Sequence, residues 1–129
     1  MTEKRLALVV DDSSATRMIL RKILSDHGFD TIEAANGSEA LQQLSQHDDV
    51  RLALVDWNMP VMNGLEFVVE ARKESRFDGV VMMMVTTETE MDRVAAALEA
   101  GANEYVMKPF TPAILAEKLT LLGMGGPAH

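Results

Sequence analysis

The sequence predicts an α/β fold, a doubly wound sheet of five parallel strands in the order 2-1-3-4-5 with five helices. Two observations support this prediction. Short apolar runs alternate with longer segments of helical period, which is typical of strand–helix units in a parallel sheet. The first, third and fourth runs are the most continuously apolar, as expected of central strands that helices cover on both faces.

The first two strand–helix units lie in the N-terminal third of the chain. The apolar run Leu6–Val10 is the first expected strand. The following segment SATRMILRKILSDHGF predicts an amphipathic helix that ends at Gly28, and its expected buried stripe comprises Ala15, Ile19, Leu20, Ile23 and Leu24. The run TIEA, Thr31–Ala34, alternates polar and apolar residues and fits a sheet edge. A second helix is expected over Gly37–Gln46.

The remaining three units follow the same pattern. The expected strands are Leu52–Val55, Val80–Val85 and Tyr105–Met107, and the expected helices are Gly64–Glu74, Glu90–Ala100 (closed by Gly101) and Pro112–Leu122. The last strand, EYVM, is short and partly polar. It therefore fits the second edge of the sheet.

The length, composition and charge of the chain exclude several classes of protein. A chain of 129 residues with 47% hydrophobic content has the size of one domain, which we expect over residues 1–124, followed by a flexible Gly/Pro-rich tail at 125–129. Without cysteine there is neither a disulfide framework nor a thiolate metal site. Twelve basic against twenty acidic residues argue against nucleic-acid or anionic-membrane partners. No apolar stretch reaches the roughly 20 residues that span a bilayer, so we expect a soluble, cytoplasmic protein.

Polar side chains follow four of the five expected strands. Asp11 and Asp12 come after the first, Asp56 after the third, Thr86 after the fourth and Lys108 after the fifth. Ligands of such sheets bind beyond the carboxyl ends of the strands. We therefore expect three carboxylates, a hydroxyl and an ammonium group to converge on one edge.

This set of groups favours a phosphoryl-transfer site. Three acids brought together would repel one another, so a bound cation is expected, and the available oxygen ligands suit Mg²⁺. Lys108 would neutralise a phosphate oxygen, and the Thr86 hydroxyl would donate to another. Asp56 is then left as the nucleophile that forms an aspartyl phosphate.

Each residue also has a purely structural interpretation. Asp11, Asp12 and Ser13 could cap the following helix, Thr86 could be an ordinary strand end, and Lys108 with the next residue could form a turn. The functional interpretation is favoured because four separate strand ends carry suitable residues together.

Other conspicuous residues are assigned to structure. The ten methionines, three of them in the run VVMMMV, are interpreted as core residues. Trp57 is expected to be a half-exposed aromatic rather than a partner contact. The three histidines are interpreted as solvated surface residues, away from the strand ends.

The assembled motifs resemble the receiver domain of bacterial two-component response regulators, and within that family the single-domain chemotaxis regulators. The resemblance covers about Arg5 to Met124. The motifs are LVVDDS with Asp11 and Asp12, VDWNMPVMNG with Asp56, MVTTE with Thr86, and YVMKPF with Tyr105, Lys108 and Pro109. One departure is Asn63, where many relatives carry Asp; this changes a loop charge but none of the site residues.

The resemblance implies how the site works. Asp56 would accept a phosphoryl group from the phosphohistidine of a sensor histidine kinase or phosphotransfer protein. Asp12, Asp56 and the backbone carbonyl of Asn58 would hold Mg²⁺, with Asp11 acting through water. The protein is then no enzyme in the usual sense, because it catalyses only its own phosphorylation and dephosphorylation at Asp56.

The resemblance also implies a switch. Thr86 would move toward the phosphoryl group while Tyr105 turns inward. The Lys108–Pro109 bond is expected to be cis. Asn58 and Glu88 match the residues that flank the path of water in a fast-decaying chemotaxis regulator, so a short-lived phosphoryl group is expected.

The output surface in this family consists of the fourth helix, fifth strand and fifth helix. Tyr105 and Lys118 match residues of that surface, whereas Met91 and Leu121 replace lysines. We expect a monomer whose downstream protein partner, with the flagellar switch as one candidate, docks an apolar helix here. Core packing of Met91 and Leu121 is the alternative, and a phosphate sink or phosphorelay adaptor is the alternative function.

Two further classes are disfavoured. A flavodoxin-type FMN binder needs hydroxyl and N–H groups around its phosphate, and Asp11 and Asp12 would repel one. A phosphatase of the haloacid dehalogenase type carries a second Asp two residues after its nucleophile, where this chain has Asn58.

Overall fold

In the described part of the chain, five strands alternate with five α-helices, and a 3₁₀ helix lies between the third helix and the fourth strand. The computed structural model describes residues 5–87 and 93–124. The elements are β1 (Arg5–Val10), α1 (Ser14–Asp26), β2 (Phe29–Ala34), α2 (Gly37–Gln46), β3 (Val50–Asp56), α3 (Gly64–Arg72), η1 (Ser75–Phe77), β4 (Val81–Thr86), α4 (Val94–Ala100), β5 (Glu104–Met107) and α5 (Pro112–Leu121).

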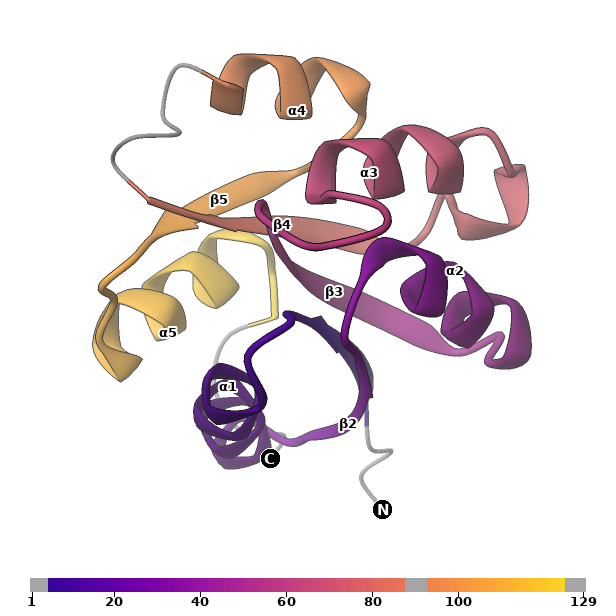
Figure 1. Cartoon of the computed structure of the whole chain (residues 1–129). Coiled ribbons are helices and arrows are strands. Elements are labelled where there is room, and N and C mark those ends of the chain that lie inside the picture. The colour runs from indigo at the N-terminus through magenta and orange to yellow at the C-terminus, as the bar shows by residue number, and fades with distance from the viewer. Residues whose placement is uncertain (1–4, 88–92, 125–129) are drawn as a thin grey trace.

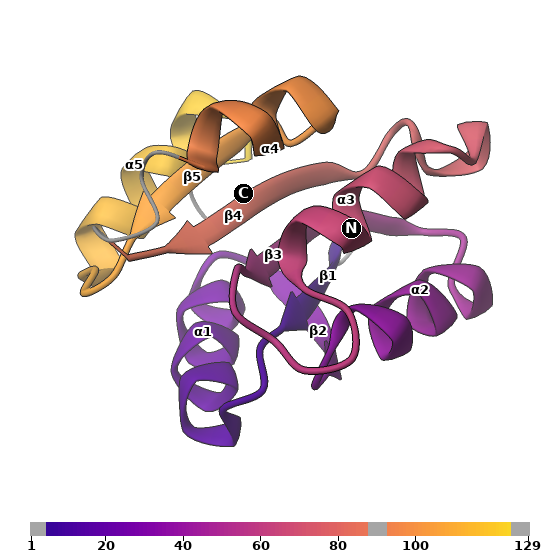
Figure 2. The same cartoon turned by 45° about the horizontal axis from the view of Figure 1, so that its top comes forward.

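The sheet is parallel throughout and has the order β2-β1-β3-β4-β5, which confirms the predicted architecture. Helices α1 and α5 cover one face, and α2, α3 and α4 cover the other (Figure 1). The second view in Figure 2 shows the same two layers on either side of the twisted sheet. Within the described ranges, no helix is long and apolar enough to cross a membrane.

The central strands are buried because helices pack on both of their faces. From Ala7 to Val10 and from Met82 to Val85 every residue has no exposed surface, and the three methionines of β4 lie in the core as predicted. The predicted tail at 125–129 and the predicted helical start at Glu90 lie outside the described residues.

Two burial predictions are wrong. Trp57 is 3% exposed instead of half exposed. Its amide donates to the carbonyl of Val85 at 3.2 Å, so the strand alternation continues past Asp56 and carries the indole into the core beneath α2, α3 and α4. Ile19, predicted in the buried stripe of α1, is 55% exposed, and Ala15 is exposed as well. Both lie in the first turns of α1, at the rim of the sheet.

Arg72 ties the end of α3 to the far edge of the sheet. Its guanidinium donates to the carbonyls of Phe77 at 2.7 Å, Val80 at 2.7 Å and Gly101 at 3.0 Å, and to the side chain of Asn103 at 3.1 Å. Burial lowers the Arg72 pKa, with a smaller opposing effect of Asp78. One half-buried cation therefore donates to four acceptors on three different segments of the chain.

We predict that Arg72→Ala lowers the free energy of unfolding by about 2 to 4 kcal/mol, because several carbonyl acceptors lose a charged donor at once. The matched control is Arg76→Ala. Arg76 lies on the surface and contacts Glu74 and Ser45, so its removal should cost less than about 0.5 kcal/mol. Urea unfolding followed by circular dichroism measures both, and equal losses would contradict the assignment.

Candidate functional site

Three carboxylates meet at the carboxyl edge of the sheet. Asp11 follows β1, Asp12 is the next residue, and Asp56 ends β3. One oxygen of each lies within 4.8 Å of the others. Asp11 and Asp56 are 1% and 6% exposed, whereas Asp12 is exposed. The structure thus brings together the three acids that the strand ends predicted.

Lys108 reaches this cluster from the end of β5. Its Nζ lies 3.2 Å from Oδ1 of Asp56 and 3.4 Å from Oδ2 of Asp11. The Lys108 amide donates to the carbonyl of Thr86 at 2.6 Å, and the Lys108–Pro109 peptide bond is cis. The ammonium group therefore bridges the two buried carboxylates.

The mutual charges shift the ionisation of the site. The pKa of Asp56 is raised from 3.8 to about 6, mainly by burial and further by the neighbouring Asp11 charge, while Lys108 opposes both effects. Burial alone would lower the Lys108 pKa, but the charges of Asp56 and Asp11 raise it above its ordinary value. A single ammonium group does not fully neutralise the cluster.

The β1–α1 loop holds Asp11 and Asp12 at the rim. Ser13 caps α1 through its side chain, which accepts from the Thr16 amide at 3.2 Å. Oδ1 of Asp11 accepts from the Ser13 amide at 2.9 Å. The capping interpretation is therefore correct for Ser13, while Asp11 also faces the ammonium group.

The β3–α3 loop passes closely behind Asp56. The Gly64 amide donates to the carbonyl of Trp57 at 3.0 Å, and a Cβ atom at Gly64 would lie 2.5 Å from the carbonyl oxygen of Asp56. Asn63 caps α3 in a capping box with Glu66, which explains why an amide serves at this position. Sequence reasoning did not identify Gly64 as a requirement of the site.

The predicted switch residues lie on β4 and β5. Thr86 is fully buried, and its hydroxyl donates to the carbonyl of Thr87 at 3.3 Å. Tyr105 is partly buried, and Nζ of Lys118 lies 4.6 Å from the centre of its ring. The same Nζ contacts the Glu104 carboxylate at 3.3 Å.

The other predicted residues are placed as follows. Asn58 lies in the β3–α3 loop, two residues beyond Asp56, and is exposed. Leu121, at the end of α5, is 73% exposed, so the alternative that it completes the core is wrong. Glu88 and Met91 lie outside the described residues.

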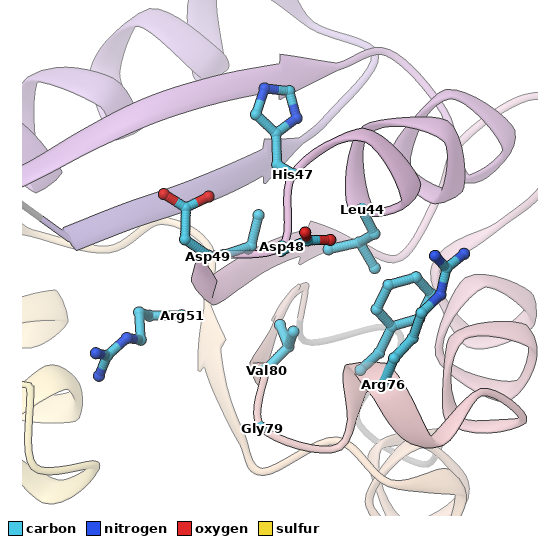
Figure 3. A pocket seen from close by; sticks show the side chains of 10 residues that line it. Leu44, His47, Asp48, Asp49, Arg51, Arg76, Gly79 and Val80 are labelled. Atoms are coloured by element: carbon cyan, nitrogen blue, oxygen red, sulfur yellow. The ribbon is translucent and has the colours of Figure 1, made fainter.

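A hollow of about 490 Å³ lies at the opposite end of the strands. Figure 3 shows the residues around it, among them Asp49 just before β3, Arg76 in η1 and Val80 just before β4. None of the predicted site residues lines this hollow. The chemistry indicated by the sequence therefore belongs to the acidic edge at the other end of the strands.

The acidic edge suits a hard cation and a phosphate. All the side-chain ligands are carboxylate oxygens, which Mg²⁺ prefers, and the ammonium of Lys108 lies beside them. The cluster carries more negative than positive charge, so a divalent cation would relieve the repulsion between Asp11 and Asp56. The residues present fit such an ion.

The chain is similar to known proteins over most of its length. Residues 7–120 match the family described as the response regulator receiver domain. The chain is 47% identical over 116 residues to the chemotaxis protein CheY1 of Helicobacter pylori, covering 89% of this chain and 94% of that protein. It is 48% identical over 120 residues to the chemotaxis protein CheY homolog of Campylobacter jejuni, covering 92% of each.

Solved structures show the same fold. The chemotaxis response regulator CheY4 of Vibrio cholerae superposes with a TM-score of 0.86 at 33% identity, covering 93% of this chain and 99% of that one. A CheY-like receiver domain protein of Methanospirillum hungatei superposes with a TM-score of 0.84 at 32% identity, covering 93% and 94%.

The raised Asp56 pKa predicts a pH-dependent stability in metal-free protein. The folded state retains a proton that the unfolded state has lost, so the free energy of unfolding should fall as the pH rises from about 4 to about 6. Asp56→Asn has no carboxyl group to ionise, so it should not lose stability over this range. It should be more stable than wild type by about 2 to 3 kcal/mol at neutral pH.

Urea unfolding in the presence of a chelator, repeated across this pH range, measures the effect. Asp49→Asn is the control, since Asp49 is an exposed acid just before β3 at the opposite end of the strand. A wild type that gains stability relative to Asp56→Asn between pH 4 and 6 would contradict the assignment.

Proposed function

The chain belongs to the response regulator receiver domain family and is of the chemotaxis type, and from this we propose that it is a Mg²⁺-dependent phosphoacceptor that signals to a protein partner. The observation that supports this most strongly is the position of Asp56. It lies beside an ammonium group and two further carboxylates at the end of a central strand. A site of this kind can receive a phosphoryl group and neutralise it.

Asp56 is the nucleophile in this proposal. One of its oxygens attacks phosphorus, the bond between phosphorus and the donor histidine nitrogen breaks, and an aspartyl phosphate forms. When bound by the carboxylates of Asp12 and Asp56, by the carbonyl of Asn58 and through water by Asp11, Mg²⁺ supplies positive charge to the phosphoryl oxygens. The three carboxylates of Asp11, Asp12 and Asp56, each with an oxygen within 4.8 Å of the others, support this proposal, and the carbonyl of Asn58 is assigned from the family resemblance.

Lys108 supplies the second positive charge. In the unphosphorylated state its Nζ contacts Asp11 and Asp56, 3.4 and 3.2 Å away. We propose that it exchanges these contacts for a phosphoryl oxygen, to which it donates a charge-assisted hydrogen bond. It then stabilises negative charge as it develops on the transferred group.

The proposed change at the output surface depends on movements of Thr86 and Tyr105. We propose that the Thr86 hydroxyl leaves the Thr87 carbonyl to donate to the phosphoryl group, and that Tyr105 turns inward with it. The Lys118 ammonium group lies over the Tyr105 ring, so this movement would alter the surface formed by β5 and α5. Asn58 and Glu88 remain the residues proposed to set a short phosphoryl lifetime.

The proposed partners are a sensor histidine kinase or phosphotransfer protein and, downstream, a protein such as a flagellar switch component. We propose that the protein acts as a monomer in the cytoplasm, without binding nucleic acid or membrane. A phosphate sink is the alternative role, and it would need no downstream partner. The domain is proposed to extend over residues 1–124.

Incubation with acetyl phosphate and Mg²⁺ should label the wild type at Asp56, and Asp56→Asn should lose at least about nine tenths of the label, because the carboxylate nucleophile is absent. Mass spectrometry of the intact protein and its peptides measures both. Lys108→Met keeps the carboxylate but removes the ammonium that stabilises charge on the transferred group, so it should label at Asp56 more slowly than wild type and fail to change the Tyr105 environment.

Asp49→Asn serves as a control for loss of an acid and should label normally. Undiminished labelling of Asp56→Asn, or of the wild type in excess chelator, would show that the phosphoacceptor or the metal requirement has been assigned wrongly.

The output surface makes a second prediction. Leu121 is 73% exposed beside a hollow also lined by Ala113 and Ala116, and Lys118 is already engaged by Glu104. We expect a partner helix to dock largely through apolar contact, so Leu121→Ser should weaken its binding about tenfold. The wild-type dissociation constant should change less than about threefold between about 0.05 and 0.3 M salt.

A flagellar switch peptide titrated into beryllofluoride-activated protein measures both quantities. Met18→Ser is the control, because Met18 is 63% exposed but lies on α1. Strongly salt-sensitive binding that Leu121→Ser leaves unchanged would contradict an apolar docking surface.

A further inference from the structure

The Arg17 side chain binds the backbone of the β1–α1 loop, which carries Asp11 and Asp12. Its Nη1 donates to the backbone carbonyl of Asp11, and its Nε donates to Oε1 of Glu33 on β2 at 2.9 Å. The Arg17 side chain is 18% exposed and that of Glu33 is 32% exposed. A partly buried, directed ion pair thus connects the edge strand to the peptide between Asp11 and Asp12.

That peptide sets the direction of the Asp12 side chain. Asp11 and Asp56 are each held by Lys108, and Asp11 also accepts from the Ser13 amide. Within residues 5–87 and 93–124, the Asp12 carboxylate makes no hydrogen bond or ion pair. Its position is therefore determined by its own backbone, and Arg17 fixes the orientation of the preceding carbonyl group.

We propose that Arg17, braced by Glu33, is a positioning residue that presents the Asp12 carboxylate to the cation. This inference rests on the proposed Mg²⁺ site and extends it to a residue that contacts no phosphoryl group. Residues that orient metal ligands from outside commonly change metal affinity by 10-fold or more. Nothing in the sequence alone distinguished Arg17 from the other charged residues of the first helix.

Arg21 provides a matched control. It also pairs with Glu33, through Nη1 and Oε2 at 2.7 Å, but its side chain is 53% exposed. No contact joins Arg21 to the acidic loop among the described residues. Removing Arg17 or Arg21 deletes one positive charge and one bond to the same carboxylate, and only Arg17 also releases the Asp11 carbonyl.

The direction of the change in Mg²⁺ affinity distinguishes a positioning role of Arg17 from a purely electrostatic one. Loss of a nearby positive charge would by itself strengthen binding of Mg²⁺ to the carboxylates. Loss of positioning would weaken it. A decrease in affinity on removal of Arg17 therefore requires the contact to the backbone and cannot come from the missing charge.

The test is a Mg²⁺ titration of unphosphorylated protein, followed by the fluorescence of Trp57, the one tryptophan and the neighbour of Asp56. Arg17→Ala should bind Mg²⁺ about 10-fold more weakly than wild type, Glu33→Gln about threefold more weakly, and Arg21→Ala within about twofold. Wild-type or tighter affinity in Arg17→Ala, or an equal loss in Arg21→Ala, would overturn the proposal. If Arg17→Ala does not fold, Arg17→Gln, which also removes the positive charge, takes its place, and wild-type or tighter affinity in that variant overturns the proposal.

A second readout needs no metal. The Ser13 amide donates to Asp11 Oδ1, so its hydrogen exchange reports the order of the loop in chelator. Exchange at Ser13 should be faster in Arg17→Ala and unchanged in Arg21→Ala, and equal exchange in both would contradict the role of Arg17. A wild type that binds no Mg²⁺ would refute the proposed metal site, and this exchange comparison would still decide whether Arg17 orders the loop.

Discussion

The site depends on one ammonium group that lies among more negative charge than it can neutralise. Lys108 Nζ contacts Asp11 and Asp56 at 3.4 and 3.2 Å, and Asp12 lies beside them. Burial, followed by the surplus negative charge, raises the Asp56 pKa to about 6. Such a cluster is relieved by a divalent cation and can accept a phosphoryl group. The surplus negative charge is thus the property on which the proposed phosphoacceptor role depends.

The fold supplies rigid positions for these groups. Asp11, Asp56 and Lys108 follow three different parallel strands, whose ends are fixed by a core with helices on both faces. Close packing then fixes the conformation of the loops. Gly64 leaves space for the Asp56 carbonyl, and Arg72 connects α3 to the distant end of the sheet. Charged groups at the rim can therefore be held together although their repulsion opposes it.

The strands, the helices and the members of the acidic cluster could be predicted from the sequence, because apolar periodicity and the residues after each strand are local signals. The strand order is inferred from the fold class that this pattern fits. The burial of Trp57 could not, since it depends on pairing with Val85 from a strand far along the chain. Ile19 is exposed because the start of α1 lies at the rim, which its own periodicity does not reveal. The role of Arg17 depends on Glu33, from another element, and needed the structure.

The most direct measurement is a crystal structure of the protein with Mg²⁺ and beryllofluoride, which imitates the phosphoryl group on a carboxylate. The account predicts beryllium bonded to an Asp56 oxygen, Mg²⁺ bound by Asp12 and Asp56, and Lys108 Nζ moved from Asp11 to a fluoride. Beryllofluoride on another residue, or an unoccupied Asp56 beside an unmoved Lys108, would contradict it.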